Sequence, residues 1–276
     1  MGSWLSHARM DFVRVDPPGC DLALVRRPAA TSPSKGTTVF LHGLGDASSA
    51  FYGAFEAPSL APFEIVLVDL LGHGSSDKPS NFDYRPASHA AVLFQALRGL
   101  ELPAPVHLVG YSLGGAVALE LGRFPLPGLG RLVLVDHALD PSLLQFSAKV
   151  VAFSEAEFRA QYAEFLAPYG ELAASFADRR WAEAAAFASS TGFYRSAKGV
   201  VEASRRGELL EHFREAAGRL TLITSSPSPP AGAADPAYGT GVLVVRLEAP
   251  NRAPMYDCPA EFYEAVRGAL GPPPTP

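Results

Sequence analysis

The sequence is poor in cysteine and has no apolar run long enough to cross a membrane. Its two cysteines, Cys20 and Cys258, lie far apart, so neither a metal site nor a disulfide framework is expected. A membrane helix needs about 20 consecutive apolar residues, and the chain has no such run. The opening MGSWLSHARM lacks the basic region and apolar core of a secretory signal. These absences predict a cytoplasmic protein that holds no metal ion and does not bind a membrane.

Basic residues are also scarce, because 23 Lys and Arg stand against 28 Asp and Glu, for a net charge of −5. A nucleic-acid partner requires a basic stripe or patch, which the sequence does not show. The glycine pattern that cradles a dinucleotide, G-x-G-x-x-G, is missing from both GLGDAS and GYSLGG. We therefore expect a small-molecule substrate, no nucleic acid and no cofactor. The oligomeric state is not encoded in any of these features.

What the chain does contain is a series of short apolar runs that alternate with helical segments. TTVFLHG, EIVLVDLLGHG, APVHLVGYS and RLVLVDHA are rich in Val and Leu, as strands buried on both faces of a parallel sheet are. Helical spacing of apolar residues marks 85–100 and 112–124 between them. Before them, MDFVRVD and DLALVRR flank PPGC and predict a hairpin. This alternation predicts a doubly wound α/β sheet with right-handed crossovers.

Residues 139–205 interrupt the alternation and predict a helical insertion. The segment 154–166 begins with Ser154 and Glu157 in capping-box positions, and its aromatic residues recur on one helical face. We expect this insertion to form a lid, with 1–138 and 206–276 as the core. Most of its many aromatic residues should pack within the insertion, while a few could line a pocket for an apolar substrate.

The segment GYSLGG (110–115) carries the strongest chemical signal. It places a G-x-S-x-G between a predicted strand and a predicted helix, which is the context of a nucleophile elbow. Such a turn would raise the Ser112 hydroxyl above the sheet at the positive end of a helix, with the backbone N–H of Leu113 facing a developing oxyanion. The alternative is an ordinary glycine-rich turn in which Ser112 only caps the helix.

The loop FLHGLGDAS (40–48) would supply a second oxyanion donor, the N–H of Leu44. With VDLLGHGSSDKP (68–79) and the elbow, it resembles the α/β-hydrolase superfamily, in its lid-bearing branch of esterases, epoxide hydrolases, dehalogenases and lactonases. The resemblance implies a mostly parallel eight-stranded sheet, flanked by helices, with a helical lid after the sixth strand. His42 is placed with the residues around the substrate, although this loop shape favours a structural hydrogen bond over a role as base.

The family's usual histidine and acid are not found where the resemblance places them. Its members carry the acid after the seventh strand, where SSPS puts Ser228, and the histidine after the eighth, where PNRAPMYDCP puts Arg252. A serine hydroxyl is a poor nucleophile without a base, and arginine does not deprotonate in proteins. Arg252 could instead hold a substrate carboxylate or stabilise an enolate. A surface arginine is the alternative.

Substitutes for the missing groups are available in VDHALD after the sixth strand. Asp136 could serve as the acid, or be only a strand-end residue. His137 could serve as the base, but adjacent residues at a strand end point to opposite sides. Asp235 lies in a Pro- and Gly-rich stretch and could also approach as an acid, although a solvated loop carboxylate is the plainer interpretation.

Three functions follow from this pattern. The first is an enzyme that acts on a small, largely apolar ester, thioester or lactone, with a non-standard catalytic set around Ser112. The second is a non-hydrolytic lyase, decarboxylase, cyclase or isomerase of bacterial secondary metabolism that uses the pocket and the oxyanion donors. The third is an inactive hydrolase fold that only binds a ligand.

Overall fold

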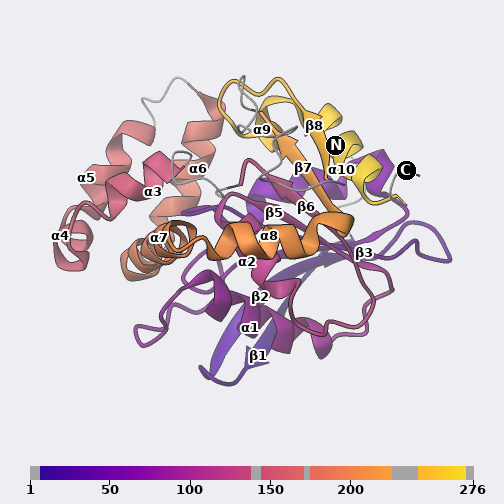
Figure 1. The fold of residues 1–276 in the computed structure, drawn as a ribbon, viewed down its shortest axis with the longest axis horizontal. Coiled ribbons are helices and arrows are strands. Elements are labelled where there is room, and N and C mark those ends of the chain that lie inside the picture. The colour runs from indigo at the N-terminus through magenta and orange to yellow at the C-terminus, as the bar shows by residue number, and fades with distance from the viewer. Residues whose placement is uncertain (1–6, 138–143, 171–174, 226–241, 272–276) are drawn as a thin grey trace.

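A computed structural model of the chain describes residues 7–137, 144–170, 175–225 and 242–271. These residues form one sheet in the order β1-β2-β4-β3-β5-β6-β7-β8, shown in Figure 1. The strands are β1 (Arg9–Val15), β2 (Cys20–Arg27), β3 (Thr37–Leu41), β4 (Glu64–Val68), β5 (Val106–Tyr111), β6 (Leu129–Val135), β7 (Leu220–Thr224) and β8 (Leu243–Arg246). The pairs β1–β2 and β2–β4 are antiparallel and all others are parallel. The predicted hairpin and the α/β fold class are confirmed.

Helices cover both faces of the sheet. The helices of the core are α1 (Pro86–Arg98), α2 (Leu113–Leu121), α8 (Glu208–Ala216), α9 (Pro254–Asp257) and α10 (Pro259–Ala269), with the 3-10 segments η2 (Ser48–Phe55) and η3 (Pro58–Leu60). On one face, Leu93, Val117 and Phe213 join a buried cluster with the strands. On the other, Phe51 and Phe262 join a second cluster. The sheet is thus the middle layer of three, as its doubly apolar strands require.

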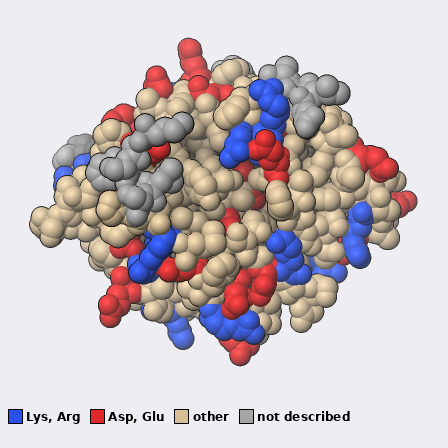
Figure 2. All heavy atoms as spheres, turned by 180° about the vertical axis from the view of Figure 1, so that it is seen from behind, with Lys and Arg blue, Asp and Glu red and all other residues tan. Residues whose placement is uncertain are grey.

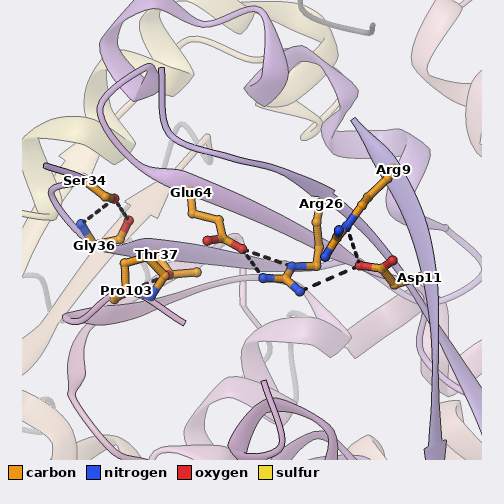
Figure 3. A network of polar contacts seen from close by, with 8 residues as sticks. All are labelled: Arg9, Asp11, Arg26, Ser34, Gly36, Thr37, Glu64 and Pro103. Atoms are coloured by element: carbon orange, nitrogen blue, oxygen red, sulfur yellow. Dashed lines mark hydrogen bonds and ion pairs between the residues drawn. The ribbon is translucent and has the colours of Figure 1, made fainter. Parts of the chain in front are cut away.

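An ion-pair network fastens the antiparallel edge of the sheet (Figure 3). Arg26 on β2 donates from Nε to Glu64 Oε1 at 3.0 Å and lies 3.7 Å from the carboxylate of Asp11 on β1. Arg9 adds a 3.1 Å bond to the same Asp11. The side chains of Arg26 and Glu64 are only 13% and 12% exposed, so their pairing is screened less than that of a surface pair. The network joins β1, β2 and β4 across the end of the sheet that lies far from the elbow.

Of the residues between β6 and β7, those before α8 form a group of helices at one end of the molecule, on the left in Figure 1. They are α3 (Gln145–Val150), α4 (Glu155–Ala160), α5 (Tyr162–Leu166), α6 (Phe176–Ala186) and α7 (Ser190–Arg205). The predicted capping box is confirmed, because Ser154 Oγ accepts from Glu157 N and the Glu157 carboxylate accepts from Ser154 N. The single helix predicted over 154–166 is wrong, since Gln161 leaves the helical region (φ −107°, ψ 14°) and separates α4 from α5.

This group of helices, called the insertion below, is held together by aromatic packing. Phe193 on α7 lies with its ring centroid 5.6 Å from Phe158, 5.5 Å from Tyr162 and 6.2 Å from Trp181. Arg195 ties the insertion to the core, because its guanidinium donates to the carbonyls of Ser80 and Phe82. That the insertion acts as a lid remains a prediction, as does the division of the chain into core and lid.

Charged side chains are dispersed over the visible surface. On the face shown in Figure 2, Lys and Arg alternate with Asp and Glu rather than gathering in a stripe. Among the described residues, no helix has the length and apolar character needed to cross a membrane.

Candidate active site

Ser112 stands on a tight turn between β5 and α2, as the elbow pattern predicts. Its backbone adopts φ +49° and ψ −111°, a left-handed strain that non-glycine residues rarely carry. Its N–H donates to Val135 O on β6 at 2.9 Å. The glycines on either side are required, because a Cβ on Gly110 would lie 2.3 Å from Gly114 O, and one on Gly114 only 2.1 Å from Leu41 O.

A cavity of about 320 Å³ opens beside Ser112. It lies between the ends of the sheet strands and the insertion. Its described lining combines polar groups from the core with aromatic side chains from the insertion: Leu44, Tyr111, Ser112, Asp136, Leu144, Phe146, Ser147, Tyr169, Asp178, Trp181, Asn251 and Arg252. An apolar wall with a few convergent polar groups is the usual form of a small-molecule site.

The sequence predicts two backbone N–H donors for this site, those of Leu113 and Leu44. Leu113 begins α2, where the first helical N–H groups have no partner within the helix. Leu44 lines the cavity itself, on the turn Gly43–Asp46 that follows β3. Within the described part of the chain, neither N–H has a hydrogen-bond acceptor. This arrangement suits the two donors of an oxyanion hole.

Asp136 follows β6 directly and faces the same cavity. Its Oδ1 accepts from Ser225 N at 2.9 Å and from Thr224 Oγ1 at 3.4 Å, and its Oδ2 accepts from the Ser225 hydroxyl. Burial raises the pKa of this carboxyl, and the three bonds with the nearby Arg252 charge oppose the rise without cancelling it. A carboxylate with a raised pKa is a stronger base than an ordinary aspartate.

His137 lies on the opposite side of the strand end from Asp136. Its ring packs edge-on against Phe213 of α8, with centroids 5.8 Å apart, and its Cβ lies near Gly115. The imidazole is buried, neither ring nitrogen has a hydrogen-bond partner among the described residues, and burial lowers its pKa to about 4. Because successive side chains at a strand end point to opposite sides, Asp136 faces the cavity and His137 faces α8. The His137 imidazole is therefore not brought to Ser112.

His42 is a structural residue in this fold. Its Nε2 accepts from Leu70 N at 3.0 Å, and its Nδ1 lies 2.8 Å from Gly43 O, so the ring carries its proton on Nδ1. Burial lowers the pKa of this histidine. Both nitrogens are used by the backbone and the residue does not line the cavity, so a contact with substrate is not supported.

Arg252 lies on the cavity wall, at an exposed position. Its backbone is left-handed (φ +56°), with its N–H on Ala249 O at 2.9 Å and its carbonyl accepting from the Tyr111 hydroxyl at 2.9 Å. Among the described residues, no carboxylate lies within 4.0 Å of the guanidinium. The register chosen on the sequence, which puts position 252 beside the elbow, agrees with this placement. Ser228 and Asp235 lie outside the described residues.

The comparisons with known proteins agree with this architecture. The model of the alpha/beta hydrolase family matches residues 38–265. The chain belongs to the alpha/beta hydrolase family. Two solved structures superpose on this chain over 95% of its length: an esterase from Exiguobacterium antarcticum (TM-score 0.74, 18% identity, 99% of that chain) and a hydrolase from Pseudomonas aeruginosa (0.71, 22%, 98%). At this identity they support the fold alone.

Curated relatives of this α/β hydrolase match over shorter stretches. An esterase of Mycobacterium tuberculosis is 37% identical over 118 residues, which is 41% of this chain and 36% of the esterase. Lipase 1 of Psychrobacter immobilis is 31% identical over 100 residues, or 36% and 31% of the two chains. The chain spans about a third of the length of the curated relatives it matches.

The chain has seven histidines, all within the described residues, and none of them lines the cavity. Apart from His137 and His42, three are buried elsewhere in the core, at 73, 89 and 107, and His212 lies 3.2 Å from Glu120 on α2. His7 is exposed on the chain before β1. Among the described residues there is also no group of three His, Cys, Asp or Glu side chains that could hold a metal ion.

Several residues that line the cavity or bind its lining were not foreseen. Ser225 binds Asp136 from the end of β7, and Asn251 lies beside Arg252 on the cavity wall. Trp181 is one of the many aromatic residues of the insertion. Their spacing in the sequence does not show which of them line a pocket and which only pack against other side chains. Because such contacts join segments far apart in the chain, no local pattern could have identified them.

Proposed function

We propose that this α/β hydrolase is an enzyme that cleaves a small, largely apolar ester, thioester or lactone, with Ser112 as nucleophile and Asp136 as its proton acceptor. The observation that carries the proposal is the shared cavity. The elbow serine and a carboxyl of raised pKa line it together, whereas none of the seven histidines does. The similarity to an esterase and a lipase supports an ester substrate.

In this mechanism, Ser112 Oγ attacks the carbonyl carbon while its proton passes to Asp136. The N–H groups of Leu44 and Leu113 hold the negative oxygen of the tetrahedral intermediate. The bond to the leaving oxygen or sulfur then breaks, and that atom takes the proton from Asp136. Water attacks the acyl-serine, its proton moves to Asp136, and the acid leaves as Ser112 regains its hydrogen.

The general base Asp136 and the two oxyanion donors, Leu44 N–H and Leu113 N–H, would contribute unequally to the rate. A positioned general base supplies roughly 10²- to 10⁴-fold, and one oxyanion donor about 10²- to 10³-fold. An aspartate is a weaker base than an imidazole at neutral pH, so we expect a slow enzyme or one with an activated substrate, such as a thioester or a strained lactone. His137 has no part in this mechanism, because its ring lies against Phe213.

Arg252 would fix the orientation of the substrate. Its guanidinium has no carboxylate partner among the described residues, and Arg252 and Ser112 line the same cavity with Phe146, Tyr169 and Trp181. An anionic or strongly polar substituent would bind Arg252 while the apolar remainder contacts the aromatic wall. An Arg252→Met variant should raise KM and leave kcat nearly unchanged, and an unchanged KM would remove Arg252 from substrate binding.

The test is covalent labelling with a fluorophosphonate, followed by peptide mass analysis. Wild-type protein should carry one adduct, on Ser112, and Ser112→Ala none. The labelling rate should rise with pH as Asp136 loses its proton, with a midpoint above the ordinary aspartate value, and Asp136→Asn should abolish this dependence. His137→Leu is the matched control and should label normally. A folded wild-type protein without an adduct would contradict the proposal.

A non-hydrolytic enzyme is the second candidate, and Arg252 favours it. With arginine at the position where the family resemblance implies histidine, Asp136 could remove a proton next to a carbonyl group. Leu44 and Leu113 would then bind the enolate oxygen, and the Arg252 charge would stabilise it further. In that case Ser112→Ala would retain turnover of the true substrate. A protein that neither labels nor turns over any carbonyl compound, yet binds one, would be the ligand-binding form of the fold.

A further inference from the structure

Three aromatic side chains of the insertion stand at steep angles to one another on the wall of the cavity. Phe146 of α3 and Trp181 of α6 have ring centroids 5.4 Å apart and an interplanar angle of 89°. Tyr169, in the 3-10 segment η5 (Ala167–Tyr169), lies 5.1 Å from Trp181 at 73° and 6.1 Å from Phe146 at 78°. All three residues line the cavity. These three nearly perpendicular rings are called the aromatic corner below.

A carboxylate lies on the same side of the cavity. Asp178 of α6 also lines the cavity and is half-buried. It precedes Trp181 by one helical turn, so the two side chains are neighbours on the helix surface. Its backbone N–H donates to Ser175 Oγ at 3.3 Å. Among the described residues, no Lys, Arg or His nitrogen lies within 4.0 Å of its carboxylate oxygens.

The other charged groups nearby leave Asp178 without a counter-charge. Arg180 on the same helix binds Glu183 at 2.6 Å. Asp136 is held by its hydrogen bonds from Ser225 and Thr224. Arg252 lines the cavity from the core, beyond ion-pair distance of Asp178. A ligand that meets both side chains would therefore turn a positive group toward the insertion and a polar or negative group toward Arg252.

We propose that the aromatic corner and Asp178 form a subsite for an ammonium group, so that the ester cleaved here carries an alkylated or quaternary ammonium. This inference rests on the proposed function, because the subsite belongs to the cavity of Ser112 and selects among its substrates. Aromatic faces attract a cation that lies within about 6 Å of the ring centroid. A carboxylate beside the rings adds charge attraction, which a neutral group of the same size would not gain.

The indole of Trp181 is held in place by the core. Its Nε1–H donates to the carbonyl oxygen of Leu44 at 2.8 Å. A Cβ on Gly45 would lie 2.9 Å from the same ring, so the turn after β3 packs directly against it. A side chain that is already ordered loses little conformational freedom when a ligand binds. The largest ring of the aromatic corner is thus ready to receive a ligand.

The plain alternative is that the rings only pack the insertion and that Asp178 only stabilises the start of α6. Phe146 does pack against Phe165 at 5.6 Å and Phe193 at 6.3 Å. Asp178 stands in the first turn of α6, where a negative charge favours the helix. Both of these roles concern folding stability, and neither predicts a preference for positive charge in a ligand. The test must therefore change the charge of the ligand and keep its shape.

Two esters provide this comparison. One is butyrylcholine, and the other is its carbon isostere, in which a tert-butyl group replaces the trimethylammonium group. Their dissociation constants are measured by calorimetry on Ser112→Ala, which cannot form an acyl-enzyme, and their kcat/KM values on wild type. We expect butyrylcholine to bind Ser112→Ala at least about tenfold more tightly than the isostere. Wild type should show the same order in kcat/KM.

Four substitutions, each added to Ser112→Ala, assign the preference to its residues. Asp178→Asn keeps the size of the side chain, and Tyr169→Leu removes a ring; each should reduce the preference to below about threefold. Tyr169→Phe retains the ring and should retain the preference. Glu211→Gln is the matched control, because it removes a first-turn carboxylate from α8, away from the cavity lining. Binding of the neutral ester to Asp178→Asn should change by less than about twofold.

The binding measurement needs no catalysis, so it separates this inference from the proposed function. If Ser112→Ala prefers butyrylcholine through Asp178 and wild type cleaves neither ester, the proposed function fails and the ammonium subsite stands. If wild type cleaves the neutral ester and Ser112→Ala binds the two esters equally, the proposed function stands and the ammonium subsite is wrong. A preference that survives both Asp178→Asn and Tyr169→Leu would place the cation elsewhere and would also overturn the inference.

Discussion

Asp46 offers a quantitative test of how the loop after β3, residues 42–47, is stabilised. It follows Gly45, is 2% exposed, and its Oδ1 accepts from Ala47 N at 3.0 Å. Burial raises its pKa from 3.8 to about 7, while the Ala47 hydrogen bond and the charge of Arg180 oppose the rise. Asp46→Asn keeps the acceptor for Ala47 N and removes the titration, because an amide has nearly the same size and no charge.

The sign of the effect follows from proton binding. Below pH 3.8 the Asp46 carboxyl is protonated in both the folded and the unfolded chain. Between about pH 4 and pH 7 the unfolded chain loses this proton and the folded chain keeps it, so folding stability falls as the pH rises. Each pH unit of that interval corresponds to 1.36 kcal/mol. Wild type should therefore lose up to about 4 kcal/mol relative to Asp46→Asn by pH 8.

The assay is urea unfolding of wild type and Asp46→Asn between pH 4 and pH 9. The difference in their free energies of unfolding should be small at pH 4, grow through the interval and become constant above about pH 7. Taking the difference removes the contributions of all other titrating groups. A difference that stays constant over the whole range would refute the reasoning, because it would mean that Asp46 is ionised in the folded chain at low pH.

Two further substitutions test the elbow and its neighbours. His137→Leu should leave the labelling rate of Ser112 within about twofold of wild type. It should also raise the free energy of unfolding by about 1 kcal/mol, because it replaces a buried imidazole that has no hydrogen-bond partner among the described residues. Lost labelling in a stable variant would restore His137 as a base. Gly114→Ala should prevent folding or destabilise by more than about 3 kcal/mol, because its Cβ would meet Leu41 O at 2.1 Å. Gly218→Ala, where a Cβ meets nothing within 4 Å, is the control, and equal expression and melting temperature of the two variants would contradict the steric argument.

The sheet and the elbow could be predicted because their signals are local. A strand buried on both faces is rich in apolar residues, and β3 and β4, which are buried at all five positions, end in the apolar runs VFL and IVLV. The glycines around Ser112 reflect a turn that excludes side chains. The break at Gln161 could not be predicted, because the apolar periodicity continues through it and only the backbone angles of the folded chain reveal two helices.

The site could be predicted only where segments of this sequence could be matched, in order, to the strands and motifs of the family. That alignment placed Asp136 and Arg252 near the elbow, and both line the cavity. The burial of Asp46 and the bond from Trp181 to Leu44 depend on how the insertion packs on the core. These contacts join residues far apart in the sequence, and a reading of local patterns carries no information about them.

The left-handed backbone of Arg252 bears on whether position 252 could carry the histidine that the family resemblance implies there. Among non-glycine residues, asparagine, aspartate and histidine adopt this conformation several times more often than others. The loop is therefore shaped for a side chain that it does not carry, and its anchors, the Tyr111 hydroxyl and the Ala249 carbonyl, bind only the backbone of residue 252. Because neither of these two bonds involves the side chain, we expect an Arg252→His substitution to leave the backbone of the loop in place.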